Sequence, residues 1–571
     1  MTALLTDNLP LLAGAPNGIK KLRELILELA VRGKLVPQDP NDEPASELLK
    51  RIAEEKARLV AEGRIKKAKA THEGLVEISY ELPSTWAVAS LGQVVEIVRG
   101  ITFPASEKSK EPELGRVACL RTANVQDEIE WDDLLYIRES FVSRSDQYVE
   151  PHDIVMSMAN SRELVGKVAL IGAELKQKTT FGGFLGVLRP VLIEPRFVMA
   201  LLRTPHARSA LIDSASQTTN IANVSLGKLR PLPFAIPPLA EQHRIVAKVD
   251  ELMALCDRLE AQQADAESAH AQLVQALLGS LTQAADAGDF AASWQRLAEH
   301  FHTLFTTESS IDALKQSLLQ LAVMGKLVPQ DPSDEPASEL LKRIQVEKQK
   351  LITEGKLRKQ KPLDEIVDEE RRFLLPPAWA WVKPEEFSMK ITDGEHFKPH
   401  TEKIGVYFLS AKDIRDDGVS LESPLFISEE TADKALQRCN PQYGDLLIVS
   451  RGATVGRMCK VNVREKFCLL GSVILIKPSE HVLSEFLSIA FKSPDSFRQL
   501  VNASGSTAQP AIYLRDLKKI ALPLPPLAEQ HRIVAKVSQL MALCDQLNTR
   551  LIQARQLSEQ LATALIEQAV A

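Results

Sequence analysis

Residues 237–259 read PPLAEQHRIVAKVDELMALCDRL, and residues 525–547 read PPLAEQHRIVAKVSQLMALCDQL, so the two stretches are identical at 20 of 23 positions. A second pair is identical at 21 of 23 positions: AVRGKLVPQDPNDEPASELLKRI at 30–52 and AVMGKLVPQDPSDEPASELLKRI at 322–344. The segments between the copies, 83–235 and 376–523, are nearly unrelated. The distance along the chain between the two copies far exceeds the period of a solenoid repeat. We therefore interpret the chain as one duplicated architecture that carries two different modules.

Each copy of PPLAEQHRIVAKV is followed by a proline-free heptad pattern. Mostly apolar or small residues alternate at spacings of four and three from Ile245 to Leu277, where Gln263 and His270 are the exceptions, and from Ile533 to Leu565. Such a pattern predicts two long helices whose seams need a partner helix. We expect the two helices to pair within the chain as an antiparallel coiled coil. A homodimer formed through the same seam is the alternative.

The variable segments have a different pattern. Short β-rich runs, such as DIVMSM at 153–158 and DLLIVS at 445–450, alternate with turn residues, and each segment ends in helical patches. The predicted fold class is therefore α+β: two α/β modules held apart by two long antiparallel coiled-coil helices, with a pseudo-twofold internal duplication. The expected divisions are an N-terminal extension (1–18), a helical repeated segment (19–80), a first module (83–235), a first long helix (236–282), a linker (283–310), a second repeated segment (311–374), a second module (376–523) and a second long helix (524–571).

Composition limits the class of protein. The chain has 571 residues and a net charge of −6, from 69 Lys and Arg against 75 Asp and Glu. DNA binding would therefore depend on local basic surface. There are six cysteines, none in a CxxC pair, and neither a run of about 20 apolar residues nor a secretory signal is present. These features predict a cytoplasmic protein.

Motifs for catalysis are missing. The sequence has no GxxxxGK[ST] phosphate loop, no HExxH and no zinc-type Cys/His cluster. The stretch NPQY at 440–443 resembles the Asn-Pro-Pro-Tyr of adenine-N6 methyltransferases, but it lacks the second proline, and no glycine-rich nucleotide turn precedes it. We therefore predict no catalytic residue, no metal site and no cofactor site in this chain. A stand-alone methyltransferase or nuclease is the alternative in the class of enzymes.

Together these residues resemble the specificity subunit of Type I restriction–modification systems. The likeness rests on the two PPLAEQHRIV-heptad segments, the two GKLVPQDPxDEPA segments and the module features, and it covers nearly the whole chain after residue 18. The module features include WAVASLG at 86–92, HDIVMSMANSRELVGKVALI at 152–171 and GDLLIVSRGATVGRMCKV at 444–461. The first module departs from this pattern by carrying NSREL where the second has RGAT.

The resemblance implies a non-catalytic subunit that reads a bipartite target on double-stranded DNA, one half-site per module. It also implies two modification (methyltransferase) subunits that use S-adenosylmethionine to methylate adenine N6. Two restriction (motor and nuclease) subunits would add ATP- and Mg-dependent cleavage. A coiled-coil scaffold or adaptor without DNA readout is the alternative function.

Polar residues in loops between strands match the donors and acceptors of base edges. The candidate DNA-binding residues are Arg121, Asn124, Arg162, Gln217, Thr218 and Asn220 in the first module, and His396, Lys398, Lys412, Arg451, Thr507 and Gln509 in the second. The candidate partner-binding residues are Glu241, Gln242, His243 and Arg244, with their copies Glu529, Gln530, His531 and Arg532. Helix capping and solvation are the alternative role for this second set.

Overall fold

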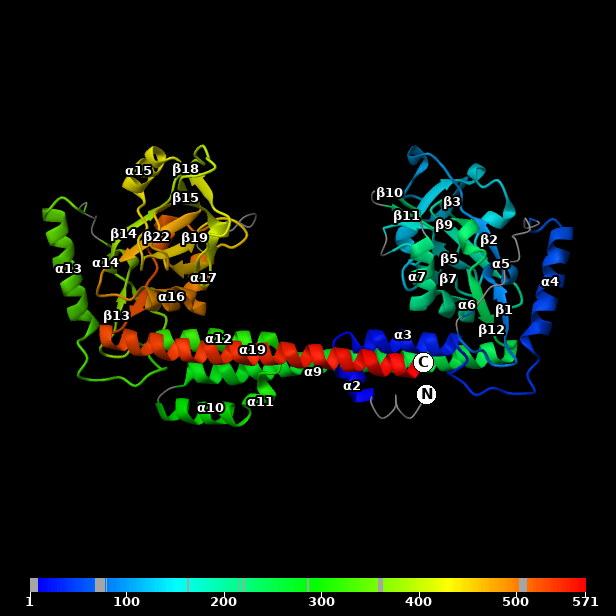
Figure 1. Cartoon of the computed structure of the whole chain (residues 1–571), viewed down its shortest axis with the longest axis horizontal. Helices are drawn as coiled ribbons and strands as arrows, with labels where there is room; N and C mark the ends of the chain where they lie inside the picture. Colours follow the sequence, from blue (N-terminus) through cyan, green and yellow to red (C-terminus); the bar gives the residue numbers. More distant parts are fainter. Residues whose placement is uncertain are drawn as a thin grey trace. The chain divides into compact units, whose positions relative to one another are not determined.

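The computed structural model describes residues 9–66, 78, 80–161, 164–214, 216–218, 221–284, 287–357, 363–502 and 511–570. The chain forms two compact units: unit 1 is Met1–Asp265 with Ala554–Ala571, and unit 2 is Ala266–Gln553. Both long helices, α9 (Leu239–Gln283) and α19 (Leu527–Val570), therefore contribute to each unit (Figure 1). Each unit holds one module, the first half of one long helix and the second half of the other.

Two sheets form the centre of the module in unit 1, called module 1 below. The four-stranded antiparallel sheet has the order β2 (Val95–Arg99), β9 (Leu185–Pro190), β5 (Ile154–Ser157), β7 (Val168–Leu170). The three-stranded sheet has the order β4 (Leu135–Arg138), β3 (Arg116–Leu120), β8 (Thr179–Phe181), and its β3–β8 pair is parallel. Two small sheets complete the module: β1 (Ala87–Ser90) with β12 (Pro233–Ile236), and β10 (Ser216–Thr218), β11 (Ile221–Asn223), β6 (Ala159–Asn160).

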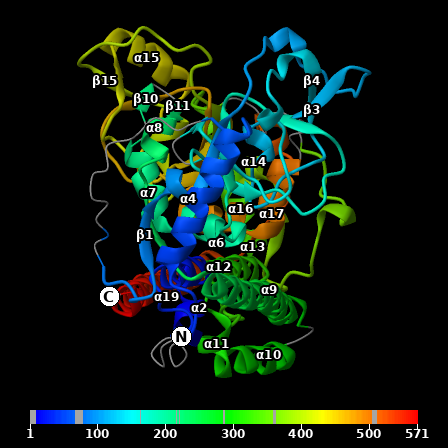
Figure 2. The same ribbon diagram turned by 90° about the vertical axis from the view of Figure 1, so that its right-hand side faces the viewer.

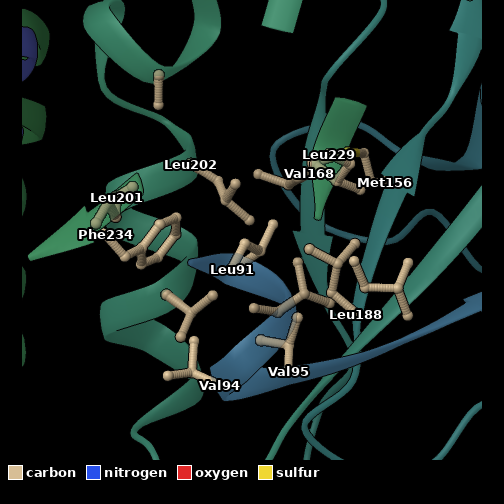
Figure 3. Packing of buried hydrophobic residues seen from close by; sticks show 14 of the residues in the cluster. Leu91, Val94, Val95, Met156, Val168, Leu188, Leu201, Leu202, Leu229 and Phe234 are labelled. Carbon is tan, nitrogen blue, oxygen red and sulfur yellow. The ribbon is translucent and has the colours of Figure 1, made fainter. Parts of the chain in front are cut away.

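Helices cover one face of the four-stranded sheet. They are α5 (Leu91–Val94), α6 (Pro195–Leu202), α7 (Pro205–Ser214) and α8 (Leu226–Leu229). Val95, Met156 and Leu188 of the sheet face Leu201 and Leu202 of α6 in one apolar cluster (Figure 3). The alternate residues of the same strands belong to a second cluster shared with the three-stranded sheet. Because successive side chains point to opposite faces, burial of both faces explains why runs such as IVMS carry no polar alternation.

The rest of unit 1 is helical. It comprises α2 (Leu9–Gly14), α3 (Gly18–Val31) and α4 (Ala45–Ala61) together with parts of the long helices. Leu48 and Ile52 of α4 belong to the module's own cluster, so this helix lies against the side of module 1 (Figure 2). The predicted extension at 1–18 thus contains a helix, α2, and the first residue of α3.

Unit 2 repeats the topology of unit 1. The four-stranded sheet of its module, called module 2 below, is β14 (Ser388–Asp393), β22 (Val473–Pro478), β19 (Leu446–Val449), β20 (Met458–Lys460). The three-stranded sheet is β18 (Leu425–Ile427), β15 (Val406–Leu409), β21 (Phe467–Leu469), again with one parallel pair, β15–β21. The small sheets are β13 (Ala380–Val382) with β23 (Leu522–Leu524) and β16 (Ile414–Arg415) with β17 (Gly418–Val419).

The helices of unit 2 correspond to those of unit 1, except that the helix at 429–438 has no α-helical counterpart between β4 and β5 of module 1. They are α12 (Glu308–Val323), α13 (Ala337–Thr353), α14 (Pro384–Phe387), α15 (Glu429–Arg438), α16 (Ser484–Lys492), α17 (Pro494–Asn502) and α18 (Leu514–Leu517). The predicted linker at 283–310 is largely helical, because it contains α10 (Ala287–Glu299), α11 (Phe301–Leu304) and the start of α12. Leu297 and Leu304 of this segment are buried in a cluster with α9 and α12. In the described part of the chain, no helix is long and apolar enough to cross a membrane.

The seam of the long helices departs from the predicted heptad. In α9, Ile245, Val249, Leu252 and Cys256 are buried as expected, but residues 260–269 are all exposed and Leu273 is 52% exposed. Burial resumes one position later, at Val274, Leu278 and Leu281. In α19 the same change exposes Leu561 and buries Ala562. The 18 residues from Cys256 to Val274 make five turns at about 3.6 residues per turn, so a four-residue stutter replaces the strict 3.5-residue repeat.

Candidate nucleic-acid interface

Module 2 has an open hollow at one end of its four-stranded sheet. Asp393 ends β14, Ser450 follows β19, and Gly471 precedes β22, and pairing of these strands brings the three positions to the same sheet edge. The cavity has a volume of about 570 Å³. Its charged and aromatic lining residues are Asp393, His396, Arg438, Arg451, Tyr513 and Arg515.

An internal network occupies part of this lining. The Arg438 guanidinium contacts the Asp393 carboxylate and also donates to Nε2 of His396, at 2.7 Å. On the other side, Tyr513 lies between two guanidinium groups, whose carbons are 6.0 Å (Arg451) and 5.2 Å (Arg515) from the ring centre. Three arginines against one buried carboxylate favour an anionic or hydrogen-bond-accepting ligand.

The corresponding edge of module 1 is built from the same backbone with different side chains. In module 1 the Val224 amide donates to Met158 O at 2.8 Å, and in module 2 the Ile512 amide donates to Ser450 O at 2.8 Å. The neighbouring pairs Asn223–Ala159 and Ala511–Arg451 are therefore equivalent. Module 1 has Asn160 on β6 at this edge, and β10 and β11 pair beside it. The two modules thus share the backbone arrangement at this end of the sheet but carry different side chains there.

The copied segments meet in one joint per unit. In unit 1 the Glu241 carboxylate accepts hydrogen bonds from Gln38 Nε2 (2.7 Å) and Trp86 Nε1 (3.1 Å). In unit 2 Glu529 accepts from Gln330 Nε2 (2.6 Å) and Trp379 Nε1 (2.8 Å). Burial raises the pKa of both carboxyl groups, and the hydrogen bonds from the Gln and Trp donors partly offset this effect.

Further copied contacts support each joint. Arg244 binds Asp42 and Arg532 binds Asp334, both at 2.6 Å. The Gln242 side chain accepts from the Glu194 amide and donates to Pro237 O, each at 2.9 Å, and Gln530 makes the matching pair of bonds with Leu483 and Pro525. The copied sequence therefore fixes a module to its long helix.

Comparison with known proteins gives the family. A family model described as "Type I restriction modification DNA specificity domain" matches residues 83–267 and 394–554. The chain is 37% identical to the Type I restriction enzyme EcoEI specificity subunit of Escherichia coli, over 97% of this chain and 94% of the relative. It is 38% identical to the EcoAI specificity subunit of Escherichia coli with the same coverage. The HsdS subunit from Thermoanaerobacter tengcongensis matches with a TM-score of 0.41 and 19% identity, over 86% of this chain and 98% of that chain.

The chain belongs to the family of Type I restriction enzyme specificity subunits. The comparisons confirm the resemblance and favour it over a coiled-coil scaffold without a DNA role. A specificity subunit is the non-catalytic chain that works with DNA and with modification and restriction subunits, and catalysis lies in those partners. Among the described residues, no group of three or more His, Cys, Asp or Glu side chains is placed to hold a metal ion, and all six cysteines are buried and free.

The predicted DNA-binding residues of this specificity subunit fall into different environments. His396 and Arg451 lie together in the hollow of module 2, and Lys398 is exposed on the loop that follows His396. The exposed Lys412 donates to Ser423 O at 3.1 Å. Gln217 and Thr218 lie on β10, which pairs with β11, but nothing is described of their side chains. Outside the described residues lie Arg162, Asn220, Thr507 and Gln509.

Asn124, which is predicted from the sequence to read bases, is buried and holds its own loop together. Its side chain is 1% exposed, accepts from the Arg121 amide at 3.0 Å and donates to two carbonyl oxygens of its own loop. Asp413 of module 2 is also buried and accepts from the Ser410 amide at 2.8 Å, so a carboxylate makes the equivalent hydrogen bond there. The side chain of Arg121 is bound to Asp133.

The predicted partner-binding residues differ in exposure. Glu241, Gln242, Glu529 and Gln530 are at most 1% exposed, and the partly exposed Arg244 and Arg532 are bound to carboxylates of the joints. Only His243 and His531 of this set are exposed. Sequence reasoning also missed Tyr513 and Arg515. The available signal was the tyrosine followed two residues later by an arginine in the closing segment of module 2.

Proposed function

We propose that this chain gives a Type I restriction–modification complex its bipartite DNA target. Module 1 reads one half-site and module 2 reads the other, which specifies both adenine-N6 methylation and ATP-dependent cleavage by the partner subunits. The observation that carries this proposal is the pair of matching joints, which present two modules of one topology but with unlike side chains at the same sheet edge. Two modules with the same topology but different side chains at the same end of the sheet suit two half-sites of different sequence.

The partners follow from the same duplication. The copied segments form the same structure in both units and so offer two equivalent docking places. Two modification subunits and two restriction subunits therefore bind one specificity subunit. His243 and His531, and the exposed pair Leu273 and Leu561, are copied positions that remain available for such docking. S-adenosylmethionine, ATP and Mg bind to the partner subunits, and this chain holds no cofactor. The complex works in the cytoplasm, where the DNA lies.

The long helices hold the two modules apart as an antiparallel coiled coil. Support comes from each unit by itself. In unit 1 the buried residues of the first half of α9 share a cluster with Ala562 and Ala569 of α19, and in unit 2 Val274 and Leu278 of α9 share a cluster with Cys544. In each unit the beginning of one long helix therefore lies with the end of the other.

A module exchange tests the proposal. Residues 83–235 are replaced by the equivalent module of another specificity subunit, and methylated adenines are mapped by single-molecule sequencing in cells that carry the whole system. One half of the methylated target should change while the other half stays. Exchange of residues 376–523 is the matched control and should change the opposite half. A target that stays unchanged in both exchanges, or changes in both halves after one, would contradict separate readout.

A further inference from the structure

The guanidinium of Arg451 stands out among the charged groups of the module 2 hollow. Arg438 is engaged by Asp393 and His396, and Arg515 lies 3.4 Å from the carboxylate of Asp516. Among the described residues, the Arg451 side chain has no hydrogen-bond or ion-pair partner, and its guanidinium carbon lies 6.0 Å from the ring centre of Tyr513. Its donors are therefore available to a ligand.

Tyr513 restricts where these donors point. A guanidinium held over an aromatic ring keeps its planar set of N–H donors free at the edge. The ring is 38% exposed and carries a second guanidinium, that of Arg515, at 5.2 Å. Such a preorganised fork matches two adjacent acceptors in one plane, and in the major groove that pattern is O6 and N7 of guanine.

Alternative base contacts find less support in the hollow. Adenine is read by the side-chain amide of Asn or Gln, and no Asn or Gln is among the described residues that line this cavity. Module 1 differs at the equivalent position, where Ala159 replaces Arg451 and Asn160 follows. At this pair of equivalent described positions, the arginine is present in module 2 and absent from module 1.

We propose that the half-site read by module 2 contains a guanine whose O6 and N7 accept hydrogen bonds from Arg451, with Tyr513 as the positioning residue. This inference rests on the proposed function, because it assumes that module 2 reads bases. It goes further by naming the base and the side chain. The expected consequence is a G·C pair at one fixed position of that half-site.

The test compares variants of the full chain in the complete system. Exchange of residues 376–523 first identifies the half-site that belongs to module 2. Arg451→Ala should then relax the requirement for guanine at one position of that half-site, by roughly 10- to 100-fold in discrimination. Arg451→Lys should give partial relaxation, because an ammonium does not make the paired contact. The half-site of module 1 should stay unchanged and serves as an internal reference.

Arg464→Ala is the matched control. Arg464 also lies over a tyrosine, 5.1 Å from the ring centre of Tyr443, but outside the hollow. Its replacement should leave every base requirement as it was. If Arg451→Ala abolishes methylation, binding of the purified complex to duplexes altered base by base gives the same comparison.

Two results would overturn the inference: a module 2 half-site without a G·C pair, or an Arg451→Ala complex with all base requirements intact. Both differ from failure of the proposed function, in which the module exchange itself leaves the target unchanged.

Discussion

Trp86 and Trp379 connect each module to its joint through one indole N–H. Both side chains are 7% exposed, and each also packs edge-on against a phenylalanine, Phe197 or Phe486, with ring centres 6.5 and 6.4 Å apart. The hydrogen bond goes to a buried carboxylate, Glu241 or Glu529. A buried charged group that loses a donor keeps its desolvation cost.

Trp86→Phe and Trp379→Phe should therefore each lower the free energy of unfolding by about 1–3 kcal/mol at neutral pH. Burial raises the folded-state pKa of Glu241 above its ordinary 4.5. A raised pKa gives a stability contribution that is full below the unfolded value and is lost as pH rises through the folded value. The decrease in the free energy of unfolding caused by loss of the indole donor should thus become smaller as pH falls toward 4.5. Urea unfolding across pH measures this, and a loss that grows on acidification would contradict it.

The residue scale also shows what sequence could and could not give. Arg451 and His396 were predicted because their types suit base edges, and the structure places both in the lining of the hollow. Asn124, Glu241 and Gln242 have equally suitable types, but they are buried, and burial depends on loops and helices brought together from elsewhere in the chain. The exact copying of EQHR predicts a partner surface, whereas in the structure Glu241 accepts from Gln38 and Trp86, and Arg244 binds Asp42.

Among the elements, α4 and α13 each place a lysine against the start of a module. Lys348 of α13 is 8% exposed and donates to Glu385 O, and burial lowers its pKa to about 8. Lys56 of α4 donates to Gly92 O (2.8 Å) and Val95 O (2.9 Å), and its pKa is lowered by the same cause.

Between pH 8 and 10.5 the unfolded chain therefore binds more protons at Lys348 than the folded chain. Stability must rise with pH in this window, because deprotonation favours the folded state. Relative to the Lys348→Met variant, the free energy of unfolding of the unaltered protein should rise by at most about 3 kcal/mol between pH 8 and 10.5. Lys342→Met, an exposed position on the same helix, is the control and should keep the pH dependence. Equal slopes for both variants would refute the buried-amine explanation.

The extent of the long helices is easier to predict than their register. Proline-free apolar spacing is a local property and indicates long helices where α9 and α19 lie, each of which begins three residues after the start of the predicted segment. The stutter was missed because Leu273 continues the heptad as well as Val274 does, and only packing against neighbours decides which is buried.

Insertion of one heptad after Gln263 and after Leu551 tests these helices. Seven residues turn a helix of 3.6 residues per turn to within about 20° of its starting face, so the buried seam should survive. Each long helix should lengthen by about 10 Å, which is the length of about three base pairs of DNA. The methylated target should gain a longer spacer, or activity should be lost because one half-site is rotated. Five-residue insertions, which turn the face by about 140°, should unfold the seam. Full methylation of the original target by the heptad variant would reject the coiled-coil proposal.

At the scale of the whole molecule, the two ends of the described chain lie together in unit 1, at the place where a continuous segment connects α9 to α12 in unit 2. In unit 1 the first and last described segments lie in one cluster, with Leu9, Leu11 and Leu12 beside Leu565, Ile566 and Ala569. Lys21 of α3 adds an ion pair with Glu559 at 3.2 Å and a hydrogen bond to Thr563 at 2.9 Å. In unit 2 the equivalent place is crossed by the chain itself, from α9 through α10 and α11 to α12.

A circular permutant should therefore keep its function. It would run from residue 287 to 570, continue through a short Gly/Ser linker, and finish with residues 9–284. This exchange moves the break from one unit to the matching place in the other and cuts no described helix or strand, so the clusters of both units stay complete. We expect methylation of the unaltered target when the permutant is expressed with its partner subunits.

A permutant opened at Asp265 is the matched control. The cut falls inside α9 and would leave about four amides and four carbonyls without helical partners at the two new ends. It should be markedly less stable and less active, although the same ends are joined. If the first permutant folds, as judged by its thermal unfolding, yet fails to direct methylation, the natural order of the units would matter beyond their packing, and the equivalence of the two crossings would be wrong.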